Sequence, residues 1–281
     1  MNFFKRHLAI LACIIVCFTM AGCGEKKSEP TIKVIDAELT EEEYAFGVDK
    51  DDTELLALVN KFIGSVKNDG TLDEICNHYF GDGIASAVAP AEYDAGRDQL
   101  IVATNAEFEP FEYTVGDKYS GIDMELAAKL ASYLDRELVI VNMDFDDVCE
   151  SVSRHECDIA IAGLTKSEAR EKFVTFSDSY YNASQKLLAM SDDTRFDGAT
   201  DAIEVEELLR GLDESVRVGV QEGTTGQYYC EGDEDWGFEG LPVTCVHYPD
   251  AVSAAEDMIK GSIDYVIIDS APAKSIAGSV K

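Results

Sequence analysis

Apolar, strand-like runs alternate with helix-like stretches between residues 99 and 162. The runs at 99–104, 138–141 and 158–162 are short and mostly apolar, which predicts buried strands. Between them lie a stretch from Gly121 with apolar residues at helical spacing and a shorter one that Asp146 or Asp147 caps. Strands separated by helices form parallel sheets, because each helix returns the chain to the start of the next strand. The sequence therefore predicts an α/β fold with a doubly wound sheet.

A second unit of the same kind follows the first. Outside the first unit, strands are predicted at 44–48, 185–190, 216–220 and 263–268, and helices at 200–209 and 251–259. In an open α/β sheet, ligands bind beyond the carboxyl ends of the strands. The residues that follow each predicted strand are therefore the candidates for a binding site.

The first 22 residues predict a secretory signal peptide. Basic residues precede an apolar run that ends near Met20 and is too short to span a membrane. The ending Ala21-Gly22-Cys23, followed by polar residues, resembles a bacterial lipobox in which Cys23 is lipidated. Residues 23–31 would then be a tether. A plain signal peptide cleaved near Ala21 is the alternative.

Composition restricts the function. Apolar residues make up 46% of the chain, enough for a core, and the formal net charge is −32. So acidic a surface argues against a nucleic-acid partner. It suits solubility in an extracellular medium.

Five of the eight cysteines lie beyond Cys23, and none forms a CxxC pair or clusters with the four histidines. We therefore expect neither a metal site nor a cofactor. Outside the cell a disulfide is chemically stable, and Cys230 and Cys245 are the preferred pair because the segment between them is loop-like and acidic. Buried free thiols are the alternative.

The strand at 158–162 ends in residues that suit a small zwitterion. Gly163 offers bare backbone, Thr165 a hydroxyl and Arg170 a guanidinium that can pair bidentately with a carboxylate. Thr165 or Ser167 is also predicted to start a helix. A solvated surface arginine after an ordinary turn is the alternative for Arg170.

Three other strand ends carry residues of the same kind. They are Asn105 with Phe108, Phe145, and the turn Gly223-Thr224-Thr225 together with Asp269. The turn exposes backbone N–H groups before a helix, which suits an anion. The carboxylate of Asp269 can pair with an ammonium group, and the two aromatic rings can stack on a ligand. Each residue also has an ordinary structural interpretation.

Together these stretches resemble the bacterial extracellular solute-binding proteins for polar amino acids, the receptors of ABC importers. The matching segments are A-T-N-A-E-F-E-P-F-E-Y, G-I-D-M-E-L-A, M-D-F-D, I-A-G-L-T-K-S-E-A-R, F-S-D-S-Y-Y, V-Q-E-G-T-T-G and I-D-Y-V-I-I-D, in the family's order. The resemblance implies a two-lobed periplasmic-binding (type II) fold. Each lobe would be a doubly wound, mostly parallel sheet, with an amino acid bound between the lobes.

The resemblance also implies a role for each strand-end residue. Arg170 and the Thr225 N–H would hold the α-carboxylate of the ligand, and Asp269, the Gly163 C=O and Thr165 would hold its α-ammonium group. Phe108 and Phe145 would stack on the two faces of the ligand. Asn105, Gln221 and Ile268 would line the pocket for its side chain. Because the amides of Asn105 and Gln221 are neutral, we expect a neutral polar amino acid such as glutamine or cystine.

The order of the segments differs from the family's. The segment that normally closes the domain lies at the other end of this chain, at residues 32–81, which predicts a circular permutation. Residues 81–97 would then join the family's usual termini. The predicted lobes are 44–179 and 31–39 plus 185–281, with a hinge at 40–43 and 180–184. A remnant of a tandem duplication is the alternative for 32–81.

The expected function is that of a monomeric receptor, lipid-anchored on the outer face of the cell membrane. It would bind an amino acid and deliver it to the permease of an ABC importer, without catalysing a reaction. One alternative is an enzyme on the same fold, of the cyclohexadienyl dehydratase kind, although the candidate residues include no nucleophile–base pair. Another is a stand-alone sensory module.

Overall fold

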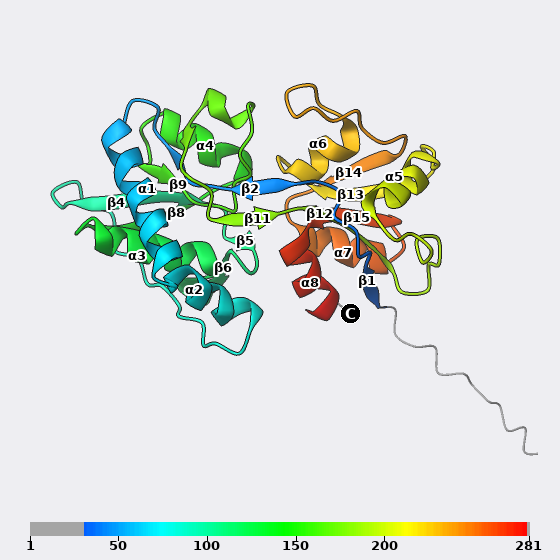
Figure 1. The fold of residues 1–281 in the computed structure, drawn as a ribbon, viewed down its shortest axis with the longest axis horizontal. Helices are drawn as coiled ribbons and strands as arrows, with labels where there is room; N and C mark the ends of the chain where they lie inside the picture. Colours follow the sequence, from blue (N-terminus) through cyan, green and yellow to red (C-terminus); the bar gives the residue numbers. More distant parts are fainter. Residues whose placement is uncertain (1–30, 280–281) are drawn as a thin grey trace, which may run out of the picture.

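The computed structural model describes residues 31–279, which form two α/β lobes that lie side by side (Figure 1). Lobe 1 is built on the sheet β10-β3-β9-β4-β8, and lobe 2 on the sheet β1-β12-β15-β13-β14. The predicted two-lobed α/β fold is confirmed. The predicted signal peptide, Cys23 and the tether up to residue 30 lie outside the described residues, as do residues 280–281.

Lobe 1 takes most of its elements from one continuous stretch of chain. The strands of its main sheet are β3 (Gly47–Val48), β4 (Gln99–Thr104), β8 (Glu137–Asn142), β9 (Ile159–Ala160) and β10 (Thr175–Phe176). A small second sheet consists of β5 (Glu107–Phe108), β6 (Glu112–Val115) and β7 (Lys118–Ser120). The helices are α1 (Thr53–Asn68), α2 (Thr71–Phe80), α3 (Ile122–Tyr133), α4 (Phe145–Ser153) and the 3₁₀ turn η1 (Arg170–Lys172). Strand β4 pairs in parallel with β8 and β9, as the strand–helix alternation predicts, and β3 and β10 are antiparallel additions.

Lobe 2 repeats this plan. Its strands are β1 (Ile32–Val34), β12 (Gln185–Met190), β13 (Arg217–Gln221), β14 (Thr244–Tyr248) and β15 (Tyr265–Asp269), and its helices are α5 (Ala202–Arg210), α6 (Thr225–Glu231), α7 (Ala251–Ile259) and α8 (Ser270–Ser279). Strand β13 pairs in parallel with β14 and β15. Strand β12 is antiparallel to its neighbour β15, and β1 is antiparallel to β12. In both lobes the parallel strands end at the edge that faces the other lobe, which is where ligands bind in such sheets.

Two antiparallel strands, β2 (Glu42–Tyr44) and β11 (Tyr181–Ala183), connect the lobes (Figure 1). The strand predicted at 44–48 is in fact two strands, because the chain leaves the ladder with β11 at Tyr44 and joins the lobe 1 sheet at Gly47. Between them, Phe46 is fully buried in the lobe 1 core.

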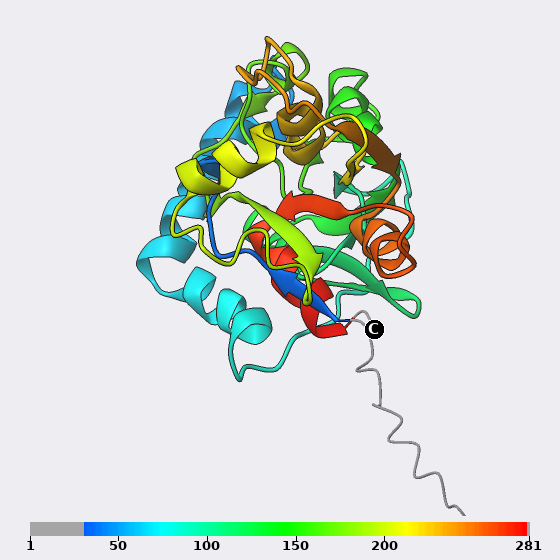
Figure 2. The ribbon, with the colours of Figure 1, turned by 90° about the vertical axis from the view of Figure 1, so that its right-hand side faces the viewer.

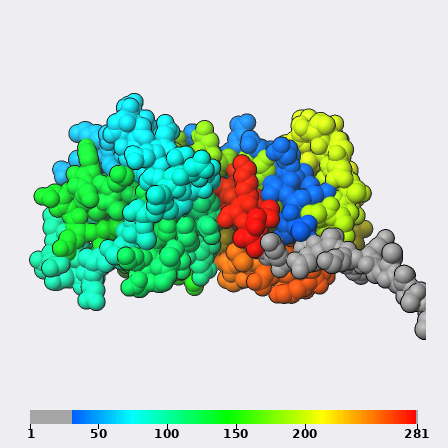
Figure 3. Space-filling view, turned by 90° about the horizontal axis from the view of Figure 1, so that it is seen from below, coloured from blue at the N-terminus to red at the C-terminus, as the bar shows by residue number. Residues whose placement is uncertain are grey.

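The segment 31–81 is part of both lobes. Strand β1 pairs with β12 at the edge of lobe 2 and α8 packs beside it, as Figure 2 shows. Strand β3 lies between β10 and β9 in lobe 1, and the apolar face of α1, with Val59 and Ile63, is buried in the same core. From below, α8 (red) lies at the junction of the two lobes (Figure 3).

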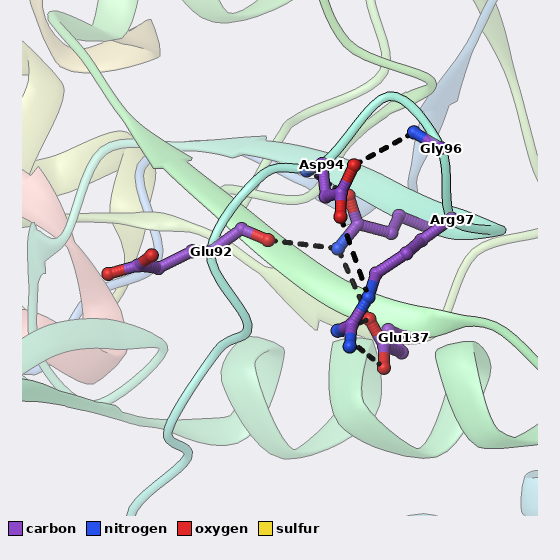
Figure 4. Close-up of polar contacts among 6 residues, drawn as sticks. Glu92, Asp94, Gly96, Arg97 and Glu137 are labelled. Carbon is purple, nitrogen blue, oxygen red and sulfur yellow. Dashed lines mark hydrogen bonds and ion pairs between the residues drawn. The ribbon is translucent and has the colours of Figure 1, made fainter.

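The stretch predicted as a linker, 81–97, has no helix or strand but is fixed by polar contacts (Figure 4). The Asp94 N–H donates to Gln99 Oε1 at 2.8 Å, and Gln99 Nε2 donates to the Glu92 carbonyl at 2.9 Å. The Arg97 guanidinium pairs with Glu137 of β8 at 2.7 Å. These contacts tie the end of the stretch to β4 and β8.

The helix predicted to start near Thr165 does not form. The backbone of this segment pairs with β2 instead, since the Ala45 N–H donates to the Leu164 carbonyl and the Lys166 N–H to the Glu43 carbonyl, both at 3.0 Å. Only the single turn η1 follows. The pairing with β2 holds Thr165 in extended backbone at the junction of the lobes.

A disulfide joins Cys230 at the end of α6 to Cys245 in β14. Among the described residues, Cys76, Cys149 and Cys157 are free thiols. The bridge encloses the loop that connects α6 to its neighbouring strand, so it restricts that loop in the folded and the unfolded chain.

Reduction of this disulfide should lower the free energy of unfolding by about 3 kcal/mol. The two cysteines are 15 residues apart, and a crosslink of that span removes that much loop entropy from the unfolded chain. Urea unfolding with and without reductant measures the change, and intact mass verifies that two hydrogens are gained. The double variant Cys230→Ser/Cys245→Ser is the control and should not respond to reductant. An equal loss in that variant would disprove the assignment.

Candidate functional site

A narrow cavity lies where the strand ends of the two lobes meet. Its lining consists of Asn105, Phe108, Phe145, Ala162, Gly163 and Thr165 from lobe 1 and Gln221, Thr224, Thr225 and Asp269 from lobe 2. Except for Arg170 and Ile268, the residues predicted to contact the ligand are therefore brought together at this cavity. Thr224 of the predicted turn also lines it, and Ala162 is an additional lining residue.

Ile268 does not line the cavity. It is buried in the core of lobe 2, next to Leu188 and Ala254 among others. Side chains alternate between the two faces of a strand. The neighbouring Asp269, at the end of β15, is the residue of this strand that reaches the cavity.

Gly163 is held in a conformation that favours glycine. Its φ is +52°, and a Cβ at this position would lie 2.9 Å from the Phe108 ring. Its N–H donates to the buried carboxylate of Asp123 at 2.7 Å. The other oxygen of Asp123 accepts from the Tyr180 hydroxyl at 2.7 Å, so this carboxylate links Gly163 to the end of lobe 1 near β11.

Two acids lie buried behind Gly163. Burial raises the pKa of Asp123 to about 6, although its hydrogen bonds with Tyr180 and Gly163 lower it. Glu112 is also fully buried, and its pKa is raised well above the ordinary value, first by burial and then by the charge of Asp123.

Arg170 lies beside the cavity, with its guanidinium between the two lobes. Its Nη1 donates to the Thr165 carbonyl of lobe 1 at 2.9 Å, and its Nη2 donates to the Gly223 carbonyl of lobe 2 at 3.2 Å. The ring centroids of Phe145 and Trp236 are 5.0 and 5.1 Å from its Cζ atom. Its exposed fraction is 9%, so the surface alternative for Arg170 is excluded.

Asp269 and Glu42 form an acidic corner of the site. The Tyr44 hydroxyl donates to Asp269 Oδ1, and Thr165 Oγ1 donates to Glu42 Oε2 at 2.6 Å. Gln185 Nε2 donates to the other oxygen of Glu42 at 3.0 Å. Burial, and next the charge of Glu42, raise the pKa of Asp269 to about 7. A cation placed here would favour the ionised carboxylate.

Glu42 and Tyr44 were not predicted as site residues. They come from β2, more than 100 residues before Thr165 and Asp269 in the sequence. The signal that could have found them is the short sequence Glu42-Glu43-Tyr44 at the predicted hinge, because a strand that crosses between lobes must pass the cleft.

Two side chains that line the cavity present unpaired acceptors. Asn105 Nδ2 donates to the Met143 carbonyl at 2.9 Å, which fixes the orientation of the amide. Asn105 Oδ1 and Gln221 Oε1 are both buried without a hydrogen-bond partner. A buried acceptor without a donor costs about 1–3 kcal/mol. A ligand that donates hydrogen bonds here would remove that cost.

Within residues 31–279, no helix combines the length and apolar character needed to cross a bilayer. The same residues contain no group of histidine, cysteine and acidic side chains arranged to bind a metal ion.

Residues 100–267, more than half of the chain, match the family model of the bacterial extracellular solute-binding proteins, family 3. This protein belongs to that family. The predicted family is therefore confirmed, and the two lobes and their cleft are those of an amino-acid-binding protein fold.

The chain is similar to curated amino-acid-binding proteins. It is 35% identical over 99 residues to the arginine-binding extracellular protein ArtP of Bacillus subtilis, covering 35% of this chain and 39% of that protein. It is 25% identical over 187 residues to the histidine-binding periplasmic protein of Escherichia coli K12, covering 66% of each. The chain thus spans less than two thirds of these relatives.

The chain is also similar to solved structures of amino-acid-binding proteins. Holo ArgBP from T. maritima is 33% identical with a TM-score of 0.53, covering 64% of this chain and 73% of that chain. An ancestral amino acid-binding protein, a precursor of cyclohexadienyl dehydratase, is 26% identical with a TM-score of 0.54, covering 74% of this chain and 78% of that chain. The fold therefore occurs in binding proteins and in the ancestry of an enzyme.

The substitution Asp269→Asn should stabilise the ligand-free protein at pH 8 and much less at pH 5. The pKa of Asp269 is raised from 3.8 to about 7 in the folded protein, so folding favours the protonated carboxyl. The cost of burying the ionised form therefore grows as the pH rises from about 4 to 7. Asparagine carries no charge and keeps an acceptor for the Tyr44 hydroxyl. Urea unfolding should show that the substitution raises the free energy of unfolding by at least about 1 kcal/mol more at pH 8 than at pH 5.

The matched control is Asp178→Asn, which removes an exposed carboxylate of lobe 1. It should have a small effect at both pH values. If Asp269→Asn raised the free energy of unfolding equally at pH 5 and pH 8, the stabilisation could not come from removing the charge of Asp269.

Proposed function

We propose that this protein is the lipid-anchored extracellular receptor of an ABC importer and binds an amino acid between its two lobes. The observation that carries the proposal is a single cavity lined by Gly163 and Thr165 of lobe 1 and by Asp269 of lobe 2, with Arg170 beside it. Membership of the solute-binding family supports it. The anchor rests on the sequence alone, through the signal peptide at 1–22 and Cys23.

Arg170 and the Thr225 N–H are proposed to hold the α-carboxylate. A guanidinium has five N–H donors, and two of those of Arg170 are used by the Thr165 and Gly223 carbonyls. Three remain, enough for a bidentate pair with a carboxylate. Thr225 is the first residue of α6, where a backbone N–H has no partner within the helix.

Asp269, the Gly163 carbonyl and Thr165 are proposed to hold the α-ammonium. Glu42 strengthens this corner, because its carboxylate accepts from the Thr165 hydroxyl and raises the pKa of Asp269. An ammonium group would offset the repulsion between the two acids. Phe108 and Phe145 would cover the faces of the ligand.

The ligand side chain is proposed to be neutral and polar, with glutamine as the first candidate and cystine as the second. Asn105 and Gln221 offer two unpaired carbonyl oxygens that need donors. The only acid among the cavity-lining residues is Asp269. Burying a charged side chain without a partner acid would be costly.

Arginine is the alternative ligand. The names of the similar proteins favour it, since ArtP and ArgBP are arginine-binding proteins. A guanidinium would also satisfy both unpaired oxygens while its flat face stacks on phenylalanine. A related ancestral arginine-binding protein has been solved bound to glutamine, which supports testing both ligands together.

Binding is proposed in preference to catalysis. The acids of the site already have partners, since Asp269 accepts from Tyr44 and Glu42 from Thr165 and Gln185. No histidine is among the residues that line the cavity. The Thr165 hydroxyl donates to the Glu42 carboxylate, but we assign this hydroxyl to the α-ammonium of the ligand and not to a nucleophile.

Calorimetry with glutamine, cystine, arginine, lysine and histidine tests the ligand class. We expect glutamine or cystine to bind tightest. Tight binding of arginine alone would replace the side-chain assignment but keep the receptor function, and no binding of any amino acid would refute the function.

The substitution Arg170→Ala should remove the binding of every amino acid in the panel, because the ligand carboxylate would be buried without its partner, at a cost of several kcal/mol. Arg170→Lys should retain partial binding, since an ammonium pairs with a carboxylate but not bidentately. Calorimetry measures both. Arg154→Ala, which removes an exposed arginine of lobe 1, is the control and should bind normally. Unchanged binding by Arg170→Ala would refute the assigned role.

We also propose that the chain is circularly permuted relative to its family. The lobes would be 44–179 and 31–39 plus 185–281, with the hinge at 40–43 and 180–184. The family match begins at residue 100, and the segment 32–81 before it supplies strands to both lobes. The fixed connection from 81 to 97 supports its role as the joint between the usual termini.

Two rearranged chains test the permutation. A chain in which residues 98–279 precede 32–81 should fold and bind the same ligand, because the contacts between these two segments are kept and only those of residues 82–97 are lost. Deletion of 32–81 should abolish folding, since it removes β1, β3 and α1 from the two cores. Circular dichroism and calorimetry measure both. A deletion variant that folds and binds would rule the permutation out.

A further inference from the structure

The loop between α6 and β14 carries Trp236, the only tryptophan of the chain. Asp233 and Phe238 exchange backbone hydrogen bonds of 2.9 and 3.0 Å across the loop, and the Trp236 N–H donates to Asp233 Oδ1 at 3.2 Å. The Cys230–Cys245 disulfide closes the base of the loop. The loop is therefore built onto lobe 2 and holds Trp236 in a defined place.

The indole of Trp236 lies between its own lobe and the other. It stacks on Tyr228 of α6, with centroids 4.8 Å apart and planes at 17°. Its ring centroid is also 5.1 Å from the Cζ atom of Arg170, which belongs to lobe 1. Phe145 of lobe 1 contacts the same guanidinium at 5.0 Å. Arg170 is thus covered by one aromatic ring from each lobe.

Other contacts join the same two segments across the cleft. Lys172 pairs with Asp235, next to Trp236, and Arg170 donates to the Gly223 carbonyl. The Lys172–Asp235 pair is exposed on both sides, so it contributes little. The contact of Trp236 with Arg170 is half-buried and involves a flat cation on a flat ring, which is the stronger kind of interaction.

Trp236 also lines a groove next to the cavity. A groove lined by Trp236, Glu234 and Lys166 shares Thr165 and Thr225 with the ligand cavity. Arg170 binds the carbonyl of Thr165, which lines this groove, so its guanidinium lies close to the groove. Covering the guanidinium therefore also shields the proposed carboxylate site from water on this side.

We propose that Trp236 is a positioning residue of the amino-acid site. When the lobes are closed, its indole covers the guanidinium of Arg170 opposite Phe145. This contact fixes the plane of the guanidinium for bidentate pairing with the ligand carboxylate and slows the release of the ligand. The proposal rests on the proposed function, since it assigns Trp236 a role in holding the ligand carboxylate through Arg170.

The test compares Trp236→Ala with Trp236→Phe. The alanine variant should release a labelled amino acid about 10-fold faster, with an association rate close to wild type, because the contact of Trp236 with Arg170 joins the two lobes and its loss would favour their opening. The phenylalanine variant keeps a flat ring and should stay within about 3-fold of wild type. Release from Trp236→Ala at the wild-type rate would overturn the proposal.

Two controls separate positioning from a general effect on the loop. Asp235→Asn removes the exposed ion pair on the same loop and should change release by less than about 3-fold. In an Arg170→Lys background, Trp236→Ala should have little further effect, because lysine offers no flat group to cover. A full 10-fold effect in that background would show that Trp236 does not act through Arg170.

The single tryptophan provides a readout that does not depend on a ligand. Replacing Arg170 by alanine should shift the emission of Trp236 and increase its quenching by acrylamide in the free protein. If the wild-type protein binds no amino acid in the panel, the proposed function fails. The fluorescence measurement then still tests whether Trp236 contacts Arg170. Unchanged emission and quenching in Arg170→Ala would overturn the proposed contact.

Discussion

The pairing of β2 with β11 is the constraint on which the site depends. These two strands carry the chain between the lobes, and β2 also pairs with the segment after β9 through Tyr44 and Thr165. Tyr44 is fully buried, with its ring 5.1 Å from Phe111 and its hydroxyl on Asp269 of lobe 2. The same strand therefore connects the lobes mechanically and supplies two of the polar groups that organise the cleft. A change of the angle between the lobes would act directly on Asp269 and Thr165.

The electrostatics of the site differ from those of the surface. The surface is strongly acidic, with a formal charge of −32 for the chain, and its ion pairs are mostly exposed and weak. In the cleft, by contrast, Asp269 and Glu42 are buried close together beside a single buried guanidinium. Such a site favours a ligand that brings both a positive and a negative group, because either charge alone would leave a buried partner uncompensated.

Much of the fold and of the site could be predicted from the sequence, for a physical reason. The parallel strands follow from the alternation of apolar runs and helices, and site residues of such sheets lie directly after the strands, so Asn105, Gly163 and Asp269 were found from local patterns. Glu42 and Tyr44 were missed because they reach the cleft from a strand that is distant in sequence. The helix expected after Thr165 was wrong because pairing with β2, a contact far from it along the chain, overrides the local preference.

The place where the chain enters the structure has a mechanical meaning. Residue 31 leads directly into β1, the edge strand of lobe 2, and the proposed lipid site at Cys23 lies only a few residues earlier. If Cys23 is lipidated as proposed, lobe 2 would be the lobe held nearer the bilayer. Lobe 1, with Arg170, Phe108 and Phe145, would then be the lobe that moves about β2 and β11. Lobe 2, which carries Asp269 and the loop of Trp236, would stay fixed at the membrane, and lobe 1 would close against it.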